Sequence, residues 1–295
     1  MQSSSSIISS LAKENTLFSV EFFPPKDDAG GKRMLNTAAA IQPYQPDFVS
    51  ITYGAGGGTR ETTMRYARAL KDDYGFEVMP HLTCVGHTVN ELLEILEDFV
   101  KAGFRNVMAL RGDPPKGEKV FKAVEGGLSY GSDLVALIRK NFPDLGIGVG
   151  GYPEKHPEAK DASTDLVNLK TKIEAGADFI TTQLFFDNQA YFDFVKSCLD
   201  IGITTPVIPG LLPVLSLGQA QRFCSMCEAS LPILLEKELE NAEESNQPAV
   251  GSQWTAEQIR GLIDGGAPGY HIYALNKPQS TLKILESLGI EKAVA

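Results

Sequence analysis

The chain has 295 residues, of which 43% are hydrophobic and 22% are charged, and its formal net charge at pH 7 is -10. This composition is typical of a globular protein with a large core, and the acidic balance excludes a general nucleic-acid-binding or anionic-membrane surface, which needs a basic excess. The first residues lack the basic region and the long apolar stretch of a signal peptide. No apolar run approaches the roughly 18 residues that cross a membrane. We therefore expect a cytoplasmic protein that binds neither nucleic acid nor a membrane.

Short apolar runs bounded by glycine and proline recur along the whole chain and predict eight strands. They lie at residues 17–23, 48–54, 77–84, 106–113, 146–153, 179–187, 206–213 and 269–276. Amphipathic patterns predict helices at residues 61–73, 89–102, 132–141, 164–175, 189–200 and 256–263, and an extra helix at 236–245 followed by an exposed loop at 246–248.

This alternation of strands and helices predicts an α/β fold. Nearly continuous hydrophobic strands between amphipathic helices indicate parallel strands buried on both faces, and eight such units close into a (β/α)8 TIM-type barrel. We expect a single catalytic domain over residues 1–295, in which residues 1–15 are a peripheral N-terminal segment. An open doubly wound sheet is the alternative.

Polar residues close most of the predicted strands. In a barrel of this kind the chemistry lies at the C-terminal strand ends, so these residues are the first candidates for a site. They are Glu21, Thr52, Tyr53, His81, Thr83, Arg111, Asp113, Tyr152, Gln183, Asp187, Tyr273 and Asn276. A barrel with a purely structural role does not need all of them.

Glu21 is the only charge within the apolar run from Phe18 to Pro25. Burial raises the pKa of a carboxyl group, and a glutamate held protonated near neutral pH can donate a proton to a substrate. A glutamate paired with a buried arginine or lysine is the alternative. The polar residues at the other strand ends favour the catalytic interpretation.

Asp165, Asn168 and Lys172 form an i, i+3, i+7 row on one face of the predicted helix after strand five. A solvated surface face is one interpretation. The row also follows the elaborate loop 151–160, which contains two prolines, and the row and the loop together could hold a sugar or a pyrophosphate.

Other patterns do not predict a site of their own. Cys224 and Cys227 form a CxxC pair without a second pair, and the GxSxG run at 127–131 lacks the preceding strand of a nucleophile elbow. The histidines lack the spacing of a zinc-binding helix, so we expect no metal site. His271 lies within the last strand, and we interpret it as structural.

Eight motifs occur in order from about residue 18 to the end of the chain. They are Val20–Pro25, Thr52–Ala55, Pro80–Cys84, Ala109–Asp113, Tyr152–Pro157, Gln183–Asp187, Pro209–Pro213 and His271–Asn276. Together they closely resemble the motifs of methylenetetrahydrofolate reductases, a family of FAD-containing (β/α)8 barrels. The resemblance implies that NADH or NADPH reduces the flavin, which then reduces 5,10-methylenetetrahydrofolate to 5-methyltetrahydrofolate. This ping-pong reaction feeds methionine synthesis.

The resemblance also implies roles for individual residues. Glu21 corresponds to the acid that protonates the folate amine nitrogen and opens its five-membered ring to an iminium. Asp113 corresponds to the aspartate beside flavin and pterin, whose charge steadies that cation. Gln183 corresponds to the amide that contacts folate and nicotinamide in turn. The substrate-binding residues implied are Gln183, Leu217, Lys277 and Thr52.

The FAD-binding residues implied by the same matching lie along strands two to six and the loops that follow them. They are Thr52, Tyr53, Ala55, His81, Arg111, Gly112, Asp113, Tyr130, Gly131, Tyr152, His156, Ala159, Asp165, Asn168 and Lys172. The chain departs from the family pattern at Thr171, where many relatives have a second base, at Leu217, where some have phenylalanine, and at Lys277, which replaces an arginine. These changes bear on phosphate contacts, nicotinamide preference and the folate tail.

Three other functions are open at this point. The chain could be a flavin-dependent barrel that receives electrons from a partner protein, a pterin-binding methyltransferase of similar shape, or a binding subunit without catalysis. The intact set of Glu21, Asp113 and Gln183 argues against the last of these. Small-molecule substrates are the expected partners, and a homo-oligomer is left open.

Overall fold

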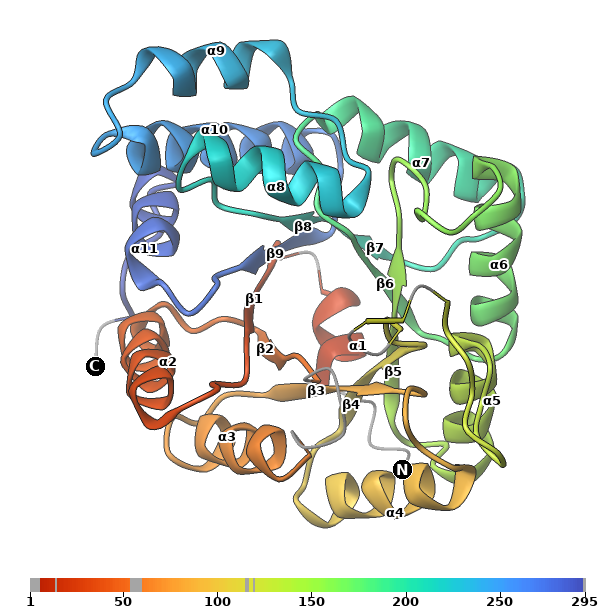
Figure 1. Ribbon diagram of the computed structural model, residues 1–295. Coiled ribbons are helices and arrows are strands. Elements are labelled where there is room, and N and C mark those ends of the chain that lie inside the picture. Colours follow the sequence, from red (N-terminus) through yellow and green to blue (C-terminus); the bar gives the residue numbers. More distant parts are fainter. Residues whose placement is uncertain (1–5, 14, 54–59, 115–116, 119, 294–295) are drawn as a thin grey trace.

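The computed structural model describes residues 6–13, 15–53, 60–114, 117–118 and 120–293. Its strands form one ring of parallel neighbours in the order β7-β6-β5-β4-β3-β2-β1-β9-β8 (Figure 1). The strands are β1 (Leu17–Phe22), β2 (Phe48–Ile51), β3 (Val78–Thr83), β4 (Asn106–Leu110), β5 (Gly146–Gly151), β6 (Phe179–Thr182), β7 (Val207–Ile208), β8 (Gly210–Leu211) and β9 (Gly269–Tyr273). All eight predicted strands are therefore present.

Helices surround the ring and connect its strands. They are α1 (Ser6–Leu11), α2 (Asp28–Ile41), the 3-10 helix η1 (Gln42–Tyr44), α3 (Arg60–Asp72), α4 (Val89–Lys101), α5 (Gly131–Asn141), α6 (Ala162–Glu174), α7 (Asn188–Asp200), α8 (Leu217–Cys227), α9 (Ile233–Asn241), α10 (Gln247–Asp264) and α11 (Pro278–Ser287). No helix among the described residues is long and apolar enough to span a membrane.

Pro209 explains why the structure has nine strands rather than eight. It separates β7, which pairs with β6, from β8, which pairs with β9. Proline has no N–H to donate, so the ladder breaks at this position. The Pro209 carbonyl still accepts a hydrogen bond from His271 N at 2.9 Å. The two short strands therefore act as one and close the (β/α)8 barrel, which confirms the predicted fold and excludes the open sheet.

The helix predictions differ from the structure mainly around α10. The predicted helix at 256–263 begins much earlier, at Gln247, so the loop expected at 246–248 is largely helical. Pro248 does not prevent this because a proline in the first turn removes an N–H that has no partner within the helix. The predicted extra helix is present as α9, which lies with α8 and α10 along one side of the ring (Figure 1).

The barrel interior changes from apolar to polar along its axis. At the N-terminal end, alternate inward residues form one buried cluster that includes Leu17, Phe48, Met79, Phe179 and Ile208. The next inward residues along the same strands include Ser19, Ser50 and His271, all nearly inaccessible to solvent. Because side chains alternate between the two faces of a strand, the outward residues pack instead against the helices.

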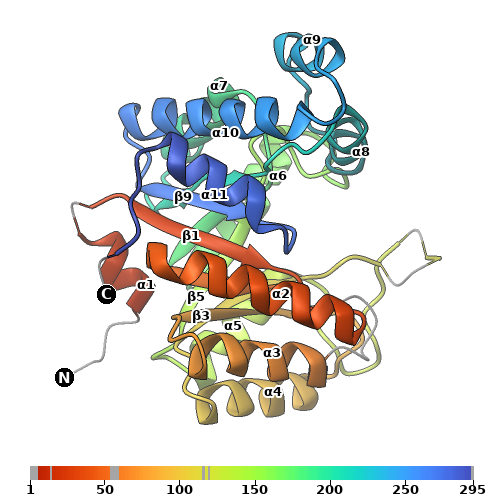
Figure 2. The same cartoon turned by 90° about the vertical axis from the view of Figure 1, so that its left-hand side faces the viewer.

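Helix α1 closes the apolar end of the barrel. It lies across the middle of the ring in Figure 1, and Ile7, which is 1% exposed, joins the interior cluster with Leu11 packed against it. The N-terminal segment, expected to be peripheral, thus contributes to the core. Figure 2 shows the long loop after β4, coloured yellow, extending from the opposite end. Among the described residues, the N-terminal end of the barrel is thus covered by apolar side chains of α1.

Candidate functional site

One polar cluster lies inside the barrel around Glu21, and we call Ser19, Glu21, Ser50, His81 and His271 the carboxylate cluster. Strand register places it, because Glu21 lies opposite Ser50 on β2 and Ser19 lies opposite His271 on β9. Ser50 Oγ is within hydrogen-bonding distance of Glu21 Oε2, at 3.2 Å. His81 Nε2 and His271 Nε2 lie 3.3 Å and 3.5 Å from the same oxygen. The structure thus surrounds one buried carboxylate with two imidazoles and a hydroxyl.

The pKa of Glu21 differs from the sequence-based expectation. Burial alone raises this pKa, as expected, but the hydrogen bond and charge of His271 and the charge of His81 outweigh burial and lower the pKa to about 2. The expectation of a carboxyl group held protonated by burial was therefore wrong, and so was the alternative of an arginine or lysine partner. In the ligand-free protein Glu21 is therefore held as a carboxylate.

His271 is the residue of this cluster whose role the sequence did not reveal. It is 1% exposed, its Nδ1 lies 2.8 Å from Ser19 Oγ, and its ring stacks on Phe48 with centroids 5.8 Å apart. It also contacts the Glu21 carboxylate directly, so the purely structural interpretation was incomplete. The sequence does contain a pattern that could have identified His271. Ser19 and Glu21, and likewise His271 and Tyr273, are two residues apart in their strands, so each pair faces the same side of the sheet.

Three buried polar atoms near the open end have no hydrogen-bond partner among the described residues. They are His81 Nε2, Thr83 Oγ1 and Thr181 Oγ1. His81 Nε2 is close to Glu21, but it is out of line for a hydrogen bond. These atoms are therefore available to hydrogen-bond a polar ligand at the open end of the barrel.

Gln183 and Thr52 lie at the same end of the barrel, directly after β6 and β2. Gln183 N donates to Gly151 O at 2.7 Å, and its side-chain Oε1 accepts from Leu184 N at 2.8 Å. Thr52 N donates to Phe22 O at 3.0 Å. Both residues are partly exposed, so their side chains are accessible to a ligand at the mouth.

A second cluster lies where β4, α5 and α6 meet, and we call Arg111, Gly131, Glu158, Asp165 and Lys172 the cation cluster. Arg111 forms a bidentate ion pair with Glu158, with N–O distances of 2.6 Å and 2.7 Å. A Cβ on Gly131 would lie 3.4 Å from Arg111 N and 3.9 Å from Lys172 Cδ. The N-terminal residue of α5 thus lies beside both basic residues, with no side chain between them.

Lys172 is directed toward the barrel rather than into solvent. Its Nζ donates to Gly150 O at 2.6 Å. The residue as a whole is partly accessible, but its ammonium group is desolvated, and this lowers the pKa to about 8 although the charge of Asp165 opposes the shift. Of the predicted row, Asp165 and Lys172 are partly buried while Asn168 is exposed. The solvated-face interpretation therefore fits Asn168 only.

The loop 152–161 holds the remaining residues expected near the cofactor. The Tyr152 and His156 rings meet edge to face at 4.5 Å, and Asp165 Oδ2 accepts from His156 N at 2.9 Å. Lys155, at a φ of 109°, donates to the carbonyl of Ala159 at 3.1 Å. These contacts fix the loop against α6, and burial lowers the pKa of His156, which favours its neutral form.

The other expected cofactor residues are less enclosed. Gly112 has a φ of +88°, a conformation that other residues rarely adopt, and it turns the chain from β4 toward Asp113. Asp113 is exposed. The pKa of Tyr152 is raised mainly by burial and secondly by the negative charge of Asp113. Tyr130 is 66% exposed. Tyr53 OH lies 2.9 Å from His87 Nε2. Ala55 is outside the described residues.

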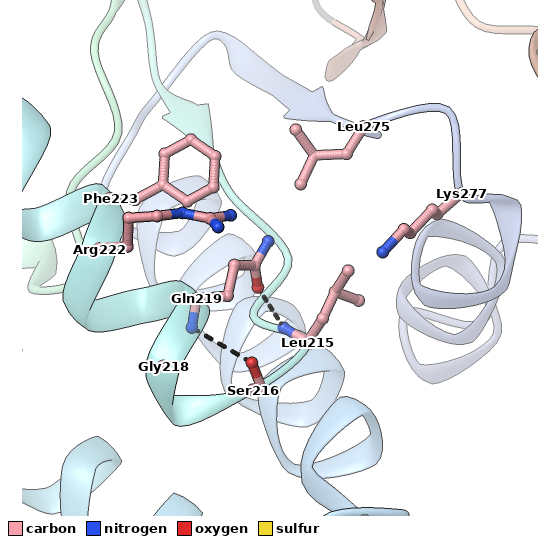
Figure 3. Close-up of a pocket in the computed structure, with 8 residues that line it drawn as sticks. All are labelled: Leu215, Ser216, Gly218, Gln219, Arg222, Phe223, Leu275 and Lys277. Atoms are coloured by element: carbon pink, nitrogen blue, oxygen red, sulfur yellow. Dashed lines mark hydrogen bonds between the residues drawn. The ribbon is translucent and has the colours of Figure 1, made fainter. Parts of the chain in front are cut away.

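A cavity of about 520 Å³ lies between α8 and the turn after β9 (Figure 3). Arg222 and Lys277 extend toward it from opposite sides, with Phe223 and Leu275 as its apolar lining. Lys277 was expected to bind substrate, and its place here is compatible with that role. Leu217, the first residue of α8, lines the adjoining hollow instead.

An unusual turn directs Leu275 and Lys277 into this cavity. Leu275 and Asn276 are both left-handed, with φ values of 51° and 53°. The Asn276 side chain accepts from Phe23 N at 3.1 Å and donates to Phe23 O at 2.7 Å. This double hydrogen bond to the segment after β1 compensates for the strain of two successive left-handed residues.

Neither the CxxC pair nor any other group in the described part of the chain forms a metal site. No cluster of three or more histidine, cysteine or acidic side chains there could hold a metal ion. Burial raises the pKa of Cys224 to about 11 and also raises that of Cys227. Both cysteines therefore remain thiols near neutral pH.

The cation cluster fits the pyrophosphate of a dinucleotide cofactor. Arg111 and Lys172 supply two cations beside the N-terminus of α5, and backbone N–H groups at a helix start bind phosphate. The unpartnered buried atoms at the ends of β3 and β6 supply hydrogen-bonding groups for a polar ring system.

The family model for methylenetetrahydrofolate reductase matches residues 6–289. The chain belongs to the methylenetetrahydrofolate reductase family. It is 37% identical to the 5,10-methylenetetrahydrofolate reductase of Escherichia coli K12, over 92% of this chain and 90% of that protein. It is also 37% identical to methylenetetrahydrofolate reductase (NADH) 1 of Arabidopsis thaliana, over 93% of this chain. The chain spans about half the length of that plant relative, 48%.

Among solved structures, the chain is similar to an uncharacterized protein from Clostridium thermocellum that binds two copies of 5-methyl-5,6,7,8-tetrahydrofolic acid. The TM-score is 0.62 with 18% sequence identity, covering 95% of this chain and 97% of that protein. At this identity the similarity supports the fold alone. The sequence-based recognition of a methylenetetrahydrofolate reductase family barrel is confirmed.

Proposed function

We propose that the chain reduces 5,10-methylenetetrahydrofolate to 5-methyltetrahydrofolate, with FAD as bound cofactor and NADH or NADPH as electron donor. The observation that carries this proposal is the buried Glu21 at the open end of the barrel, surrounded by His81, His271 and Ser50. A site that delivers one proton to a folate nitrogen needs a carboxyl group with a proton source beside it, shielded from water.

Bound FAD would supply hydride transfer, accepting hydride from the nicotinamide and giving it to the folate at the same site. Arg111 and Lys172 would hold its phosphates, and Glu158 would then release Arg111. Thr83 and Thr181, whose buried hydroxyls have no hydrogen-bond partner among the described residues, would bind polar atoms of the ligands, with His81 Nε2 beside Glu21. Use of the same open end by nicotinamide and folate in turn would give ping-pong kinetics, and the methyl product would supply methionine synthesis.

The cavity beside α8 suits the acidic tail of a folate. Arg222 and Lys277 are cations at its rim, and neither belongs to an ion pair in the described residues. A lysine contacts a carboxylate at a single point, whereas an arginine can bind it with two parallel hydrogen bonds. Arg222 can therefore provide the bidentate contact that Lys277 cannot. Gln219 is held between them, with its Oε1 accepting from Leu215 N at 2.6 Å.

Asp113 is placed to steady a cationic iminium near the mouth, because it carries an exposed carboxylate next to Tyr152 and Arg111. Its charge also disfavours the electron-rich reduced flavin. We expect Asp113→Asn to raise the flavin midpoint potential and to slow folate reduction. A redox titration with an unchanged potential would place Asp113 away from the ring system.

The test of the proposed function separates its two half-reactions. The purified protein, loaded with FAD under anaerobic conditions, is mixed with NADH or NADPH, and bleaching of the flavin absorbance is followed. Methylenetetrahydrofolate is then added to the reduced protein. We expect bleaching by at least one nicotinamide and recovery of the yellow colour with formation of 5-methyltetrahydrofolate. A protein that binds FAD but is not reoxidised by the folate contradicts the proposal. The cytoplasmic location expected from the sequence stays a prediction.

A further inference from the structure

Behind Glu21 the barrel interior contains a continuous chain of hydrogen-bonding groups. Ser19, Ser50 and His271 are 0%, 0% and 1% exposed, and they lie on the adjacent strands β1, β2 and β9. His271 Nδ1 lies 2.8 Å from Ser19 Oγ, and His271 Nε2 lies 3.3 Å from Ser50 Oγ. Ser50 Oγ in turn lies 3.2 Å from Glu21 Oε2. The chain runs from Ser19 through His271 and Ser50 to Glu21.

Hydrogen-bond directions can be assigned from the Ser19 end. Ser19 Oγ donates to Tyr270 O at 3.3 Å, so it accepts from His271 Nδ1–H. Only Nε2 of His271 can then gain or lose a proton without leaving a buried group unsatisfied. Ser50 has a single hydroxyl proton, which can point either to Glu21 or to His271 but not to both.

Two arrangements satisfy every group in this chain. In the first, His271 is an imidazolium that donates from Nε2 to Ser50, and Ser50 donates to the Glu21 carboxylate. In the second, Glu21 is protonated and donates to Ser50, and Ser50 donates to the neutral Nε2 of His271. The two arrangements have the same total charge and differ only by the transfer of two protons along the chain.

We propose that Ser50 relays a proton between His271 and Glu21, so that His271 is the proton reservoir from which Glu21 is loaded before it donates to substrate. This inference rests on the proposed function, in which Glu21 is the proton donor. His271 and Ser50 are positioning and relay residues, because both are nearly inaccessible to solvent and act through Glu21.

The relay is balanced in protons and involves no oxidation. The N–H bond at His271 Nε2 breaks as a new O–H bond forms on Ser50, and the original Ser50 O–H bond breaks as an O–H bond forms on Glu21. After Glu21 passes that proton to the folate nitrogen, the pair has one proton fewer. It regains this proton from solvent at the open end, since each reduction by NADH or NADPH consumes one proton.

Two other titratable groups face this chain. His81, on β3, lies 3.3 Å from Glu21 and adds to the charge that favours the carboxylate. Tyr273, on β9, contacts the His271 ring edge to face with centroids 5.4 Å apart, and its hydroxyl donates to Thr182 O. Burial and the charge of Glu21 raise the pKa of Tyr273 well above 10, so Tyr273 stays neutral. His81 is thus the group whose titration must be separated from that of His271.

The relay gives Glu21 a proton source inside the barrel. Ser50 Oγ lies 3.2 Å from Glu21 Oε2 and 3.3 Å from His271 Nε2, so its hydroxyl is the group through which a proton can pass from the imidazole to the carboxylate.

The first experiment measures the coupling without substrate. The FAD-loaded protein is labelled with ¹⁵N in its histidine rings, and the ring nitrogens of His271 are followed by NMR over a range of pH, with His81→Gln, His87→Gln and His156→Gln used to assign the four rings. We expect Glu21→Gln to shift the ring-nitrogen signals of His271 and to change their response to pH, because the carboxylate 3.5 Å from Nε2 is lost. An unchanged His271 titration in Glu21→Gln overturns the relay.

The second experiment uses Ser50→Ala with Ser19→Ala as its matched control. Both changes remove a buried hydroxyl next to His271, but only Ser50 lies between His271 and Glu21. We expect Ser50→Ala to slow flavin reoxidation by methylenetetrahydrofolate by on the order of 100-fold and to change its pH profile, the usual scale for lost proton transfer. Flavin reduction by nicotinamide stays at the wild-type rate, and Ser50→Thr, which keeps the hydroxyl, restores reoxidation.

The outcomes distinguish the relay from the proposed function. Equal slowing by Ser50→Ala and Ser19→Ala, or an unchanged pH profile in Ser50→Ala, overturns the relay while the reductase function stands. Failure of the wild-type flavin to be reoxidised by the folate overturns the proposed function instead, and the NMR titration then still decides whether the proton pair exists. If Ser50→Ala does not fold, Ser50→Gly is the second variant without the hydroxyl, and flavin reoxidation at the wild-type rate in it overturns the relay.

Discussion

The carboxylate cluster and the cation cluster lie at the same end of one barrel, but they are built differently. The carboxylate cluster comes entirely from strands, and its members are paired by sheet register and almost inaccessible to solvent. The cation cluster comes from the end of β4, the start of α5, helix α6 and a loop, and its basic groups are bound to the protein's own acceptors, Glu158 and Gly150 O.

This difference separates proton chemistry from cofactor binding. A buried group in a strand keeps its geometry whether or not a ligand is present, which suits a donor that must be in place for each turnover. Partly exposed ion pairs contribute little net stability, so an incoming phosphate can replace them at small cost. We therefore expect changes in the first cluster to affect the folate half-reaction and changes in the second to affect FAD binding.

The largest expected effect comes from Glu21→Gln. Folate reduction falls by at least about 100-fold because the proton donor is lost, whereas FAD remains bound and is still reduced by nicotinamide. Stopped-flow absorbance of the two half-reactions measures both rates. Equal slowing of the two half-reactions would show that Glu21 is not the proton donor. It would also show that the two clusters do not have separate functions.

Lys172→Ala tests whether the cation cluster binds FAD. Loss of a charge-assisted hydrogen bond to phosphate weakens FAD binding by about 1.5 to 3 kcal/mol, or roughly 10- to 150-fold. Flavin release on dilution, followed by fluorescence, measures the loss, and added FAD restores activity. Lys170→Ala is the matched control, because Lys170 lies on the same helix and donates to Ile201 O instead. A variant that stays yellow and active through extensive dilution refutes the cofactor assignment of Lys172.

The pH dependence of FAD binding tests whether Lys172 contacts the phosphates as a cation. Lys172 binds phosphate as a cation, so its contribution is complete below its pKa of about 8 and is lost as the pH rises through that value. A bound phosphate raises this pKa, so FAD binding takes up protons on the alkaline side. Titration of FAD fluorescence with a pH indicator measures affinity and uptake together, and Lys172→Met lacks both effects. An affinity that does not change with pH would show that Lys172 stays charged or lies away from the phosphates.

Glu158→Gln has the smallest expected effect. Glu158 competes with phosphate for Arg111, so its removal tightens FAD binding, though by no more than about fivefold because a partly exposed ion pair contributes about 1 kcal/mol at most. Glu154→Gln, in the same loop, is the control, since Glu154 accepts from Ser230 N rather than from Arg111. Weaker binding in Glu158→Gln would mean that Glu158 orients Arg111 for the cofactor.

The sequence predicted the barrel well because hydrophobic periodicity is a local property. All eight strands and most helices are near their predicted positions, and polar residues at strand ends identified the open end of the barrel. Two predictions differ from the structure, and each difference has a local physical reason. Pro209 divided the seventh strand by removing one donor, and the loop expected at 246–248 is largely helical because the first turn of α10 accommodates Pro248.

The site could be predicted only in part because its electrostatics depend on partners far away in the chain. Glu21 was found from its apolar surroundings, but the direction of its pKa shift depends on His81 and His271. Ser19 and His271 are 252 residues apart, and Arg111 and Glu158 are 47 apart. Strand register and loop conformation bring such residues together, and neither can be obtained from local sequence patterns.

The pairing of β1 with β9 has a consequence for the nascent chain. Glu21 is synthesised early, yet His271 belongs to β9, so the carboxylate has no imidazole from that side until the chain has left the ribosome beyond residue 273. Contacts of such long sequence separation form late and slowly. Closure of the barrel by its final strand and assembly of the proton pair are therefore one event, and a chain cut short before residue 269 would have an acidic side chain exposed at the unpaired edge of an open sheet.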